Sequence, residues 1–512
     1  MGNKQSSKRK GKTTNLGAKN QVNAQRDGTN SPGERDVMNT RSPGGPPPPP
    51  PAGAPPPPPA PGGPPLPVSH APTATQTHKP RTIQTHAPTT TQTHAPAIAQ
   101  RHGPTVTELV NTLAAFRHGR IMPPKINDSS DDDDDDEEYE GPCAVIHNGS
   151  AMIKAGFAGD DKPRAIIPSI VGRVSNRHPS MATFRDGSAP KDMYFGYEAW
   201  AKCGVLNIEH PIKHGVVQSW DSMEALWKDT FYNELRIAPE EHPVLLTDAP
   251  LTPKANREKM AQIMFEAFSV PAMYVTTDAK LPLYFMGRNT GFVVKSGYGS
   301  SYTVPINEGS VVEKGVQHMR IAGQALTEYM KKLLQEDGYS LTTKAEHEIV
   351  ADIKEKLSYV SQDFDKEMSE FAEQSKSKKV YELPDGRIIK VDSPRFRCPE
   401  LLFNPSLIDS TDPGLARMLC ATVKRTDDYG VRQIVLSGGS TLFPGMASRL
   451  NQEIRDEWPC SIMDCSRVLQ PIRYSVFLGG SILASLDTFK SMCITNEEFE
   501  DVGPSIVHRK CL

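Results

Sequence analysis

Two short turns contain the residue types that hold phosphate groups. Residues 148–151 read Asn-Gly-Ser-Ala, and residues 296–299 read Ser-Gly-Tyr-Gly. Glycine lets a backbone approach a ligand closely, so that its N–H groups can surround phosphate oxygens. One turn of this kind is weak evidence, because most are simple hairpins. Two of them, about 150 residues apart, predict two similar lobes that close on one ligand.

The segments around these turns have the pattern of alternating strands and helices. Strand-like runs at residues 143–146 and 291–294 each lead into a turn and then into a second strand. From Pro142 onward, hydrophobic periodicity and glycine-bounded strands continue to the end of the chain. We therefore expect an α/β domain over residues 141–512.

Seven segments of this domain resemble conventional actin nearly letter for letter. They are residues 231–236, 238–247, 253–260, 352–357, 396–406, 474–486 and 503–511. The similarity extends over about 370 residues, the whole length of an actin. The chain is therefore similar to the actin family, and the resemblance implies the two-lobed α/β fold that actins share with sugar kinases and the large heat-shock chaperones.

The resemblance breaks at five positions that actins use for ATP hydrolysis. Actins carry an aspartate at each of the two turns, where this chain has His147 and Lys295. Tyr298 stands where actins have a third acidic residue. Tyr302 stands where they have the histidine that helps to position the attacking water. The water-orienting glutamine aligns with Asp278.

These five changes predict a site that does not hydrolyse ATP. A divalent cation prefers carboxylate oxygens and ordered waters, and here two acidic positions carry a lysine and a histidine. Without the cation, the charge that develops on the γ-phosphate loses its main stabiliser, and an ionised Asp278 would repel it. Loss of a single aligned electrostatic group commonly costs about 10²–10³ in rate. We therefore expect a pseudo-ATPase without a metal site.

Most residues that bind the nucleotide in actins are retained. Those on the phosphate side are Asn148, Gly149, Ser150, Lys154, Ser296, Gly297 and Gly299. On the nucleoside side Gly323, Lys354, Glu355 and Gly439 match actin, and Phe443 and Arg473 are mild substitutions, whereas Ala351 replaces an arginine near the adenosine. One hypothesis is that Lys295 acts as a built-in cation, so that ATP or ADP binds with weak or no Mg²⁺ dependence. The other is an empty cleft in which Lys295 pairs with Asp278.

The resemblance extends to surfaces that contact other proteins. A groove in which many actin-binding proteins insert a helix is lined by residues that align with Tyr284, Gly287, Leu483, Leu486, Thr488 and Met492. The filament surfaces differ more. A loop at residues 175–189 is longer than in actin, residues 409–412 replace an apolar plug, and a deletion follows near residues 427–431. These differences predict that the chain does not form ordinary filaments by itself.

The first 140 residues predict a mostly disordered arm made of unlike segments. Residues 1–30 form a basic tail in which Gly2 fits the myristoylation pattern, and the lipid and the basic charge together favour an anionic membrane surface. Residues 31–67 contain polyproline runs, which profilin and other aromatic-lined grooves bind. Residues 68–104 hold a polar repeat of eight residues. The alternatives are a solvated tail and stiff or disordered spacers.

The last part of the arm has a more specific pattern. Leu109, Leu113 and Phe116 lie on one face of an amphipathic helix predicted within residues 105–125, and an acidic linker follows at residues 126–140. The order of proline-rich segment, helix and acidic run resembles the actin-binding region of the Wiskott–Aldrich and verprolin families. It implies that the helix binds actin in trans or the chain's own actin-like domain in cis. The alternative is a linker helix beside a solubilising charge run.

Composition excludes several classes of protein. No run of eighteen apolar residues appears, and no apolar stretch follows the start, so we expect neither a membrane span nor secretion. The eight cysteines are scattered without a CxxC pair, which favours free thiols in the cytosol. We expect no nucleic-acid partner.

Together these features predict a non-hydrolysing actin-like scaffold or regulator in the cytoplasm and cytoskeleton. It would bind profilin and actin and reach the membrane through Gly2. There are two rival hypotheses: an ATP-hydrolysing, polymerising actin with an altered metal site, and a nuclear actin-like subunit of a chromatin-modifying complex. Phosphate release in Mg²⁺ tests the first rival, and location in the cell tests the second.

Overall fold

The computed structural model describes residues 141–174, 191–373, 379–383, 385–426, 433–457 and 467–511. The five predicted segments of the arm, including Gly2 and the amphipathic helix, lie outside the described residues. The loop at residues 175–189 and the deletion near residues 427–431 also lie outside them. The predictions made for these segments therefore stay predictions.

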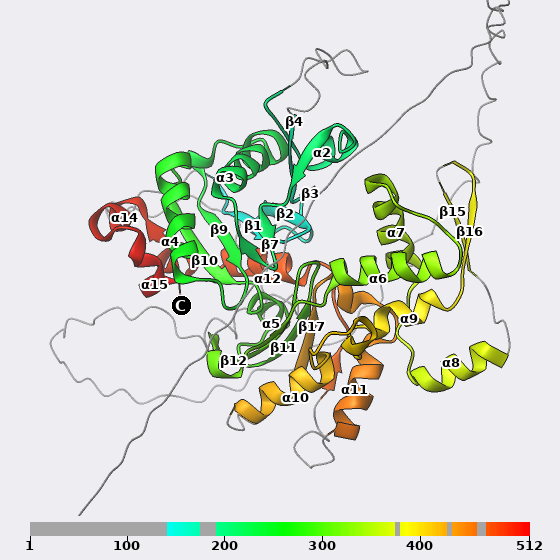
Figure 1. Cartoon of the computed structure of the whole chain (residues 1–512). Helices are drawn as coiled ribbons and strands as arrows, with labels where there is room; N and C mark the ends of the chain where they lie inside the picture. Colours follow the sequence, from blue (N-terminus) through cyan, green and yellow to red (C-terminus); the bar gives the residue numbers. More distant parts are fainter. Residues whose placement is uncertain are drawn as a thin grey trace, which may run out of the picture. The chain divides into compact units, whose positions relative to one another are not determined.

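A mixed sheet of six strands forms the centre of the first half of the domain (Figure 1). Its spatial order is β19 (Ile494–Thr495), β10 (Ala272–Thr277), β9 (Val244–Asp248), β1 (Ala144–Asn148), β2 (Met152–Phe157) and β3 (Ala165–Pro168). Strand β1 is antiparallel to β2 and parallel to β9, and β9 is parallel to β10. Strands β1, β9 and β10 are buried along their whole length, as expected for central strands covered on both faces.

A second sheet repeats this arrangement. Its main order is β13 (Ser310–Val311), β12 (Ser301–Asn307), β11 (Gly291–Ser296), β17 (Gln433–Ser437) and β18 (Arg467–Leu469), and β14 (Gln317–Met319) also pairs with β12. Strand β11 is antiparallel to β12 and parallel to β17, just as β1 is related to β2 and β9. Each predicted glycine turn therefore joins the two strands of a hairpin. The predicted α/β class and its two similar halves are confirmed.

Helices cover each sheet and bury a separate apolar core against it. Around the first sheet lie α3 (Trp220–Asp229), η1 (Thr230–Leu235), α4 (Lys254–Gln262), η3 (Ile263–Ala267), α5 (Leu281–Phe285), α12 (Ser475–Ala484), α13 (Phe489–Met492), α14 (Asn496–Val502), η7 (Pro504–Ile506) and α15 (Val507–Lys510). Around the second lie α6 (Gly323–Glu336), α7 (Lys344–Leu357), α9 (Pro394–Glu400), α10 (Leu415–Arg425) and α11 (Met446–Glu457). In α6, Leu326, Met330 and Leu333 recur at helical spacing and point into this second core.

Smaller elements complete the described chain. Strands β4 (Val171–Val174), β5 (Met193–Phe195) and β6 (Leu206–Glu209) form a sheet beside α2 (Gly196–Ala201). Two further hairpins are β7 (Ile212–Lys213) with β8 (Val216–Val217), and β15 (Lys379–Glu382) with β16 (Ile388–Val391). The rest are α8 (Phe364–Glu373) and the short turns η2 (Pro239–Glu241), η4 (Glu313–Gly315), η5 (Pro405–Ile408) and η6 (Gly439–Leu442).

Two predictions from composition can be compared with the described residues. Six of the eight cysteines fall in this part of the chain, and all six are free thiols, five of them buried. None of the described helices is long and apolar enough to cross a membrane.

The contact between α12 and α5 leaves no room for a side chain at Gly479. An added Cβ there would lie 2.0 Å from the carbonyl oxygen of Leu281, which is backbone and cannot turn aside. We predict that Gly479→Ala lowers the free energy of unfolding by about 2 kcal/mol, within the range for overpacked sites.

Chemical denaturation of the full chain measures this effect. The matched control is Gly204→Ala, because a Cβ at Gly204 meets no atom within 4 Å. Equal stability of the two variants would contradict the tight helix contact.

Candidate functional site

The two glycine turns lie close to each other and are joined by a third segment. The backbone N–H of Gly215 donates to Ser150 Oγ in the first turn at 3.0 Å. In the second turn, the carbonyl oxygen of Gly299 lies 2.6 Å from Nδ1 of His214. Both linking residues have a positive φ, 52° for His214 and 82° for Gly215, so the backbone of this short turn curves to meet both hairpins. The two halves of the domain therefore meet at the predicted site.

The turns form one end of a cavity of about 780 Å³. Twelve of the thirteen residues predicted to bind a nucleotide line this cavity: Asn148, Gly149, Ser150, Lys154, Gly297, Gly299, Gly323, Lys354, Glu355, Gly439, Phe443 and Arg473. The five replaced positions, His147, Asp278, Lys295, Tyr298 and Tyr302, line it as well. Residues from both sheets therefore surround one space, as the paired turns predicted.

Ser296 is the exception among the predicted binding residues. Its side chain is fully buried, and its hydroxyl lies 2.8 Å from the hydroxyl of Ser301 across the β11–β12 hairpin. Ser296 therefore does not line the cavity, and its predicted part in nucleotide binding stays a prediction. It is a core residue that fixes the base of the second turn.

Two other predicted residues use their side chains to hold the site together. Asn148 donates from Nδ2 to the carbonyl oxygen of Thr247, and its Oδ1 accepts from Nε1 of Trp227 at 3.0 Å. Lys354 donates to the carbonyl oxygen of Gly323 at 3.1 Å and to Thr327 Oγ1 at 2.8 Å, which ties α7 to the start of α6. Both residues line the cavity, but their polar groups are engaged by the protein.

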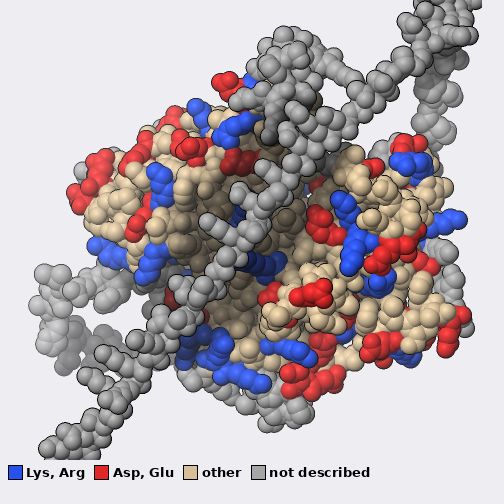
Figure 2. Space-filling view, in the orientation of Figure 1, with Lys and Arg blue, Asp and Glu red and all other residues tan. Residues whose placement is uncertain are grey.

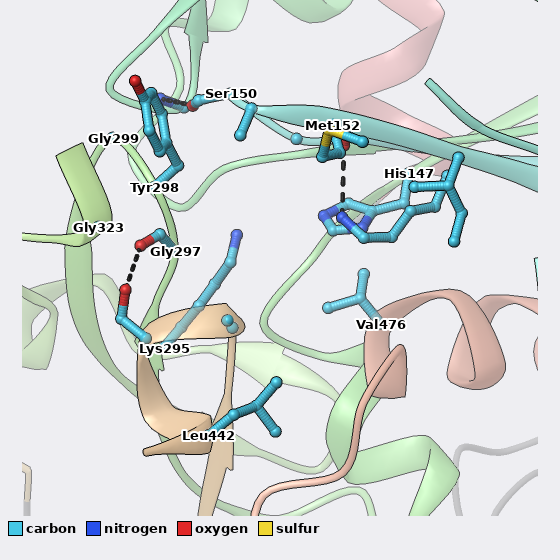
Figure 3. A pocket seen from close by; sticks show the side chains of 18 of the residues that line it. His147, Ser150, Met152, Lys295, Gly297, Tyr298, Gly299, Gly323, Leu442 and Val476 are labelled. Atoms are coloured by element: carbon cyan, nitrogen blue, oxygen red, sulfur yellow. Dashed lines mark hydrogen bonds between the residues drawn. The ribbon is translucent and has the colours of Figure 1, made fainter. Parts of the chain in front are cut away.

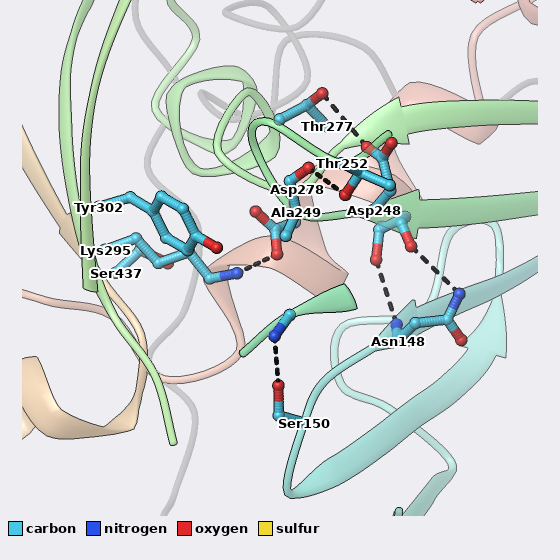
Figure 4. A network of polar contacts seen from close by, with 12 residues as sticks. Asn148, Ser150, Asp248, Ala249, Thr252, Thr277, Asp278, Lys295, Tyr302 and Ser437 are labelled. Carbon is cyan, nitrogen blue, oxygen red and sulfur yellow. Dashed lines mark hydrogen bonds and ion pairs between the residues drawn. The ribbon is translucent and has the colours of Figure 1, made fainter. Parts of the chain in front are cut away.

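Lys295 reaches into the cavity from β11 (Figure 3) and forms an ion pair with Asp278 (Figure 4). Asp278 follows β10 of the first sheet, so the pair connects the two halves of the domain. The side chains are 13% and 3% exposed, respectively. Burial raises the pKa of Asp278 above its usual value, although Lys295 opposes that shift. Oδ1 of Asp278 has no hydrogen-bond partner among the described residues.

His147 is the second unusual group at this end of the cavity. It is 8% exposed, and neither ring nitrogen has a hydrogen-bond partner among the described residues. Burial, and then the charges of Lys154 and Lys295, lower its pKa well below the usual value for histidine. Lys154 lies directly opposite His147 in the β1–β2 register, and its ammonium donates to the carbonyl oxygen of Met152 at 3.4 Å.

The two tyrosines are neutral groups at neutral pH. Tyr302 lies opposite Lys295 in the β11–β12 register and donates its hydroxyl to the carbonyl oxygen of His214 at 3.1 Å. Burial raises its pKa, and burial also raises the pKa of Tyr298 to about 12. Tyr298 and Tyr302 therefore provide neutral hydroxyl groups at positions where actins have an acidic residue and a histidine.

The residues present do not fit a divalent cation. Mg²⁺ requires oxygen ligands, usually from carboxylates and water, and the carboxylate beside the turns, Asp278, is already paired with Lys295. The neighbouring Asp248 is held by Arg257 through two hydrogen bonds of 2.6 and 2.9 Å. Within the described ranges, no cluster of three histidine, cysteine or acidic side chains is suited to a metal.

The same residues do fit a phosphorylated ligand. An added Cβ at Gly439 would meet no atom within 4 Å, and one at Gly297 would meet only the carbonyl oxygen of Ser300, at 3.8 Å. Their backbones therefore border open space in the cavity. Lys154 and Lys295 provide two ammonium groups there, which attract anionic oxygens. Phe443 also lines the cavity but is largely buried in the second core, whereas Glu355 is exposed.

The predicted partner groove is only partly open. Its six residues lie on α5, α12, α13 and the segments beside them, at the surface of the first core. Leu483 and Leu486, however, are 1% and 5% exposed and belong to that core, whereas Tyr284 and Met492 are partly buried against it. The structure brings the residues together but covers two of the expected apolar contacts. Docking of a partner helix there stays a prediction.

Several residues of the site were not predicted from the sequence. His214 and Gly215 join the two turns, Trp227 orients Asn148, and Ser440 donates to the carbonyl oxygen of Gly297 at 2.9 Å. The partners are separated by at least 65 residues, so no local pattern connects them. The sole local signal was the His-Gly dipeptide between the two short strands β7 and β8, which is typical of a turn.

The comparison with known families agrees with the sequence resemblance and with this geometry. The family model described as Actin matches residues 139–512, which is most of the chain. Every residue that the structure describes lies within the matched range.

Removal of Lys295 alone should leave a buried charge without its partner. We predict that Lys295→Met lowers the free energy of unfolding by about 3 kcal/mol at neutral pH, as for other broken buried pairs. Because the pKa of Asp278 is raised in the folded protein, this loss should shrink as the pH falls and the carboxyl group takes up a proton.

The double variant Lys295→Met with Asp278→Asn is the control, because it removes both charges. It should regain most of the lost stability in denaturation at neutral pH. A double variant as unstable as Lys295→Met alone would show that the ion pair is not the cause.

Proposed function

The chain belongs to the actin family, and on this premise we propose that it is an actin-like cytoskeletal scaffold or regulator that binds ATP or ADP without hydrolysing it. The observation that supports this proposal most directly is the Lys295–Asp278 ion pair at the phosphate end of the cavity. By the resemblance to actins, an aspartate at the position of Lys295 would help to hold the water shell of a metal ion. Here a lysine occupies that position, and the nearest carboxylate neutralises it.

Hydrolysis also requires a group that accepts a proton from the attacking water. Tyr302 is a neutral hydroxyl that donates to the backbone, and Asp278 is engaged by Lys295. In the protein without a ligand, burial and then Lys154 and Lys295 lower the pKa of His147. Among the five replaced positions, therefore, the one carboxylate is paired with a lysine and no side chain is a ready proton acceptor. This arrangement supports assignment as a pseudo-ATPase.

Binding of a nucleotide needs fewer groups than its hydrolysis. The phosphates would be held by the turns at Gly149 and Gly297 together with Lys154 and Lys295, and the nucleoside by Gly439, Phe443 and their neighbours. When bound, the nucleotide supplies several negative charges and links the two halves of the domain. Because two ammonium groups already face those charges, we infer that binding depends weakly or not at all on Mg²⁺.

The partners in this proposal follow from the sequence of the arm. Its polyproline runs, predicted helix and basic tail favour profilin, actin and an anionic membrane surface reached through Gly2, which places the protein in the cytoplasm and cytoskeleton. On the face drawn in Figure 2, basic and acidic side chains of the described residues are interspersed. This face therefore lacks the basic stripe expected of a nucleic-acid-binding surface. We propose no nucleic-acid partner.

Phosphate release by the full chain tests the pseudo-ATPase directly. With ATP and Mg²⁺, we predict turnover below one-hundredth of that of conventional actin measured in parallel, since even one missing electrostatic group costs about 10²–10³ in rate. Turnover equal to that of actin would overturn the proposal and favour an active ATPase with an altered site.

Nucleotide affinity with and without a chelator tests the second part of the proposal. We predict that ADP stays bound in excess chelator, because Lys154 and Lys295 are covalent parts of the site and cannot be removed. Undetectable binding of both ADP and ATP would refute nucleotide binding and leave an empty cleft.

Placing aspartates at positions 147 and 295, where actins carry them, should make nucleotide binding depend on a metal ion. We predict that the double variant His147→Asp with Lys295→Asp binds ADP in Mg²⁺ but loses it in chelator. The matched control is Lys162→Asp, which makes a similar charge change at an exposed position. Chelator-resistant binding by the double variant would show that Lys295 does not replace the cation.

A further inference from the structure

His147 is a polar side chain without a polar partner in a cavity wall. It is more than nine-tenths buried, both ring nitrogens lack a hydrogen-bond partner among the described residues, and the ring borders the cavity (Figure 3). An unpaired buried polar group costs free energy, typically about 1–3 kcal/mol. A ligand that accepts a hydrogen bond from this ring would remove that cost.

Lys154 and Lys295 place two cations beside the same ring. Lys154 lies opposite His147 on the neighbouring strand, so the two side chains leave the sheet on one face. Lys295 reaches the same space from the second sheet. Three groups that can carry positive charge therefore face the same cavity, and before a ligand arrives the two lysines oppose each other's charge and that of the His147 ring.

We propose that bound phosphates make His147 and Lys154 take up protons, so that protons perform the charge balancing that a divalent cation would otherwise perform. The inference rests on the proposed nucleotide binding and adds its regulation: affinity rises as the pH falls. An anion between these groups cancels their mutual repulsion and favours their charged forms. The complex then holds more protons than the free protein and ligand.

The charges around the cluster agree with the sign of this effect. In the free protein, burial and the nearby cations Lys295 and Arg473 lower the pKa of Lys154 to about 8. His147 is shifted in the same direction by burial, Lys154 and Lys295. The charged groups that face the cluster are Lys154 from β2, Asp278 after β10, Lys295 from β11 and Arg473 ahead of α12, while Asp248 at the end of β9 is held by Arg257.

Asp278 adds to the uptake of protons on phosphate binding rather than opposing it. Its pKa is already raised by burial, and Lys295 is the main charge that lowers it again. When Lys295 turns toward a phosphate, Asp278 loses part of that stabilisation and gains a negative neighbour. Both changes favour the protonated carboxyl group. All three titratable groups therefore gain protons on binding.

Calorimetry of ADP binding to the full chain tests the inference. Titrations at pH 8.5 in chelator, in two buffers with different ionisation enthalpies, give the number of protons taken up per ADP. The second ionisation of a phosphate, near pH 6, is complete under these conditions and contributes little. With a pKa of about 8 in the free protein, we expect Lys154 to take up more than about half a proton per ADP.

Lys154→Arg separates charge from titration, because arginine stays protonated throughout this pH range. We expect this variant to bind ADP with a proton uptake near zero at pH 8.5.

His147→Asn should keep the proton uptake at pH 8.5 but flatten the rise in ADP affinity between about pH 7 and pH 6. Added Mg²⁺ should cause a several-fold loss of affinity in the parent protein, because it competes with the cluster for the phosphates.

The outcomes distinguish this inference from the function on which it rests. Tight ADP binding without proton uptake, or uptake that persists in Lys154→Arg, would overturn the proton linkage but leave nucleotide binding intact. Affinity that increases with Mg²⁺ would overturn the inference as well. If ADP does not bind at any pH, both the inference and the proposed nucleotide binding fail.

Discussion

The ion pair between Lys295 and Asp278 determines what the cavity can hold. It joins the end of β11 in the second sheet to the segment after β10 in the first, and both partners are largely buried. Its net charge is near zero, and because the lowered pKa of His147 leaves its ring neutral, the remaining positive charge beside the pair comes from Lys154. The proposal that a nucleotide binds here without a divalent cation rests on this arrangement.

The scaffold around the pair is built to keep it in place. The His214–Gly215 turn contacts both glycine hairpins, and Asn148 is held by Trp227 and Thr247 from two other elements. These bonds join residues of the protein to one another and hold the two glycine turns together. A nucleotide bound as we propose would contact both of these halves.

The sequence predicted the fold and most of the cavity because those features are repeated or local. The two strand–turn–strand patterns indicated two similar halves, and residue-by-residue resemblance gave about half of the residues that line the cavity. The sequence did not show where the side chains of these residues point or what they contact. Ser296 bonds across its hairpin, Lys354 ties two helices together, and Leu483 is buried by neighbours. The contacts of His214 and Trp227 join residues 79 or more positions apart, so they emerge only in the folded chain.

A count of metal ions in the nucleotide complex tests the central claim most directly. The full chain would be saturated with ADP in the presence of Mn²⁺ and freed of unbound ions by rapid gel filtration, and its bound manganese would then be measured by electron paramagnetic resonance. Binding through Lys154 and Lys295 predicts one ADP and close to no manganese per chain. One manganese ion per bound ADP would contradict it and show that this cleft still assembles a metal site.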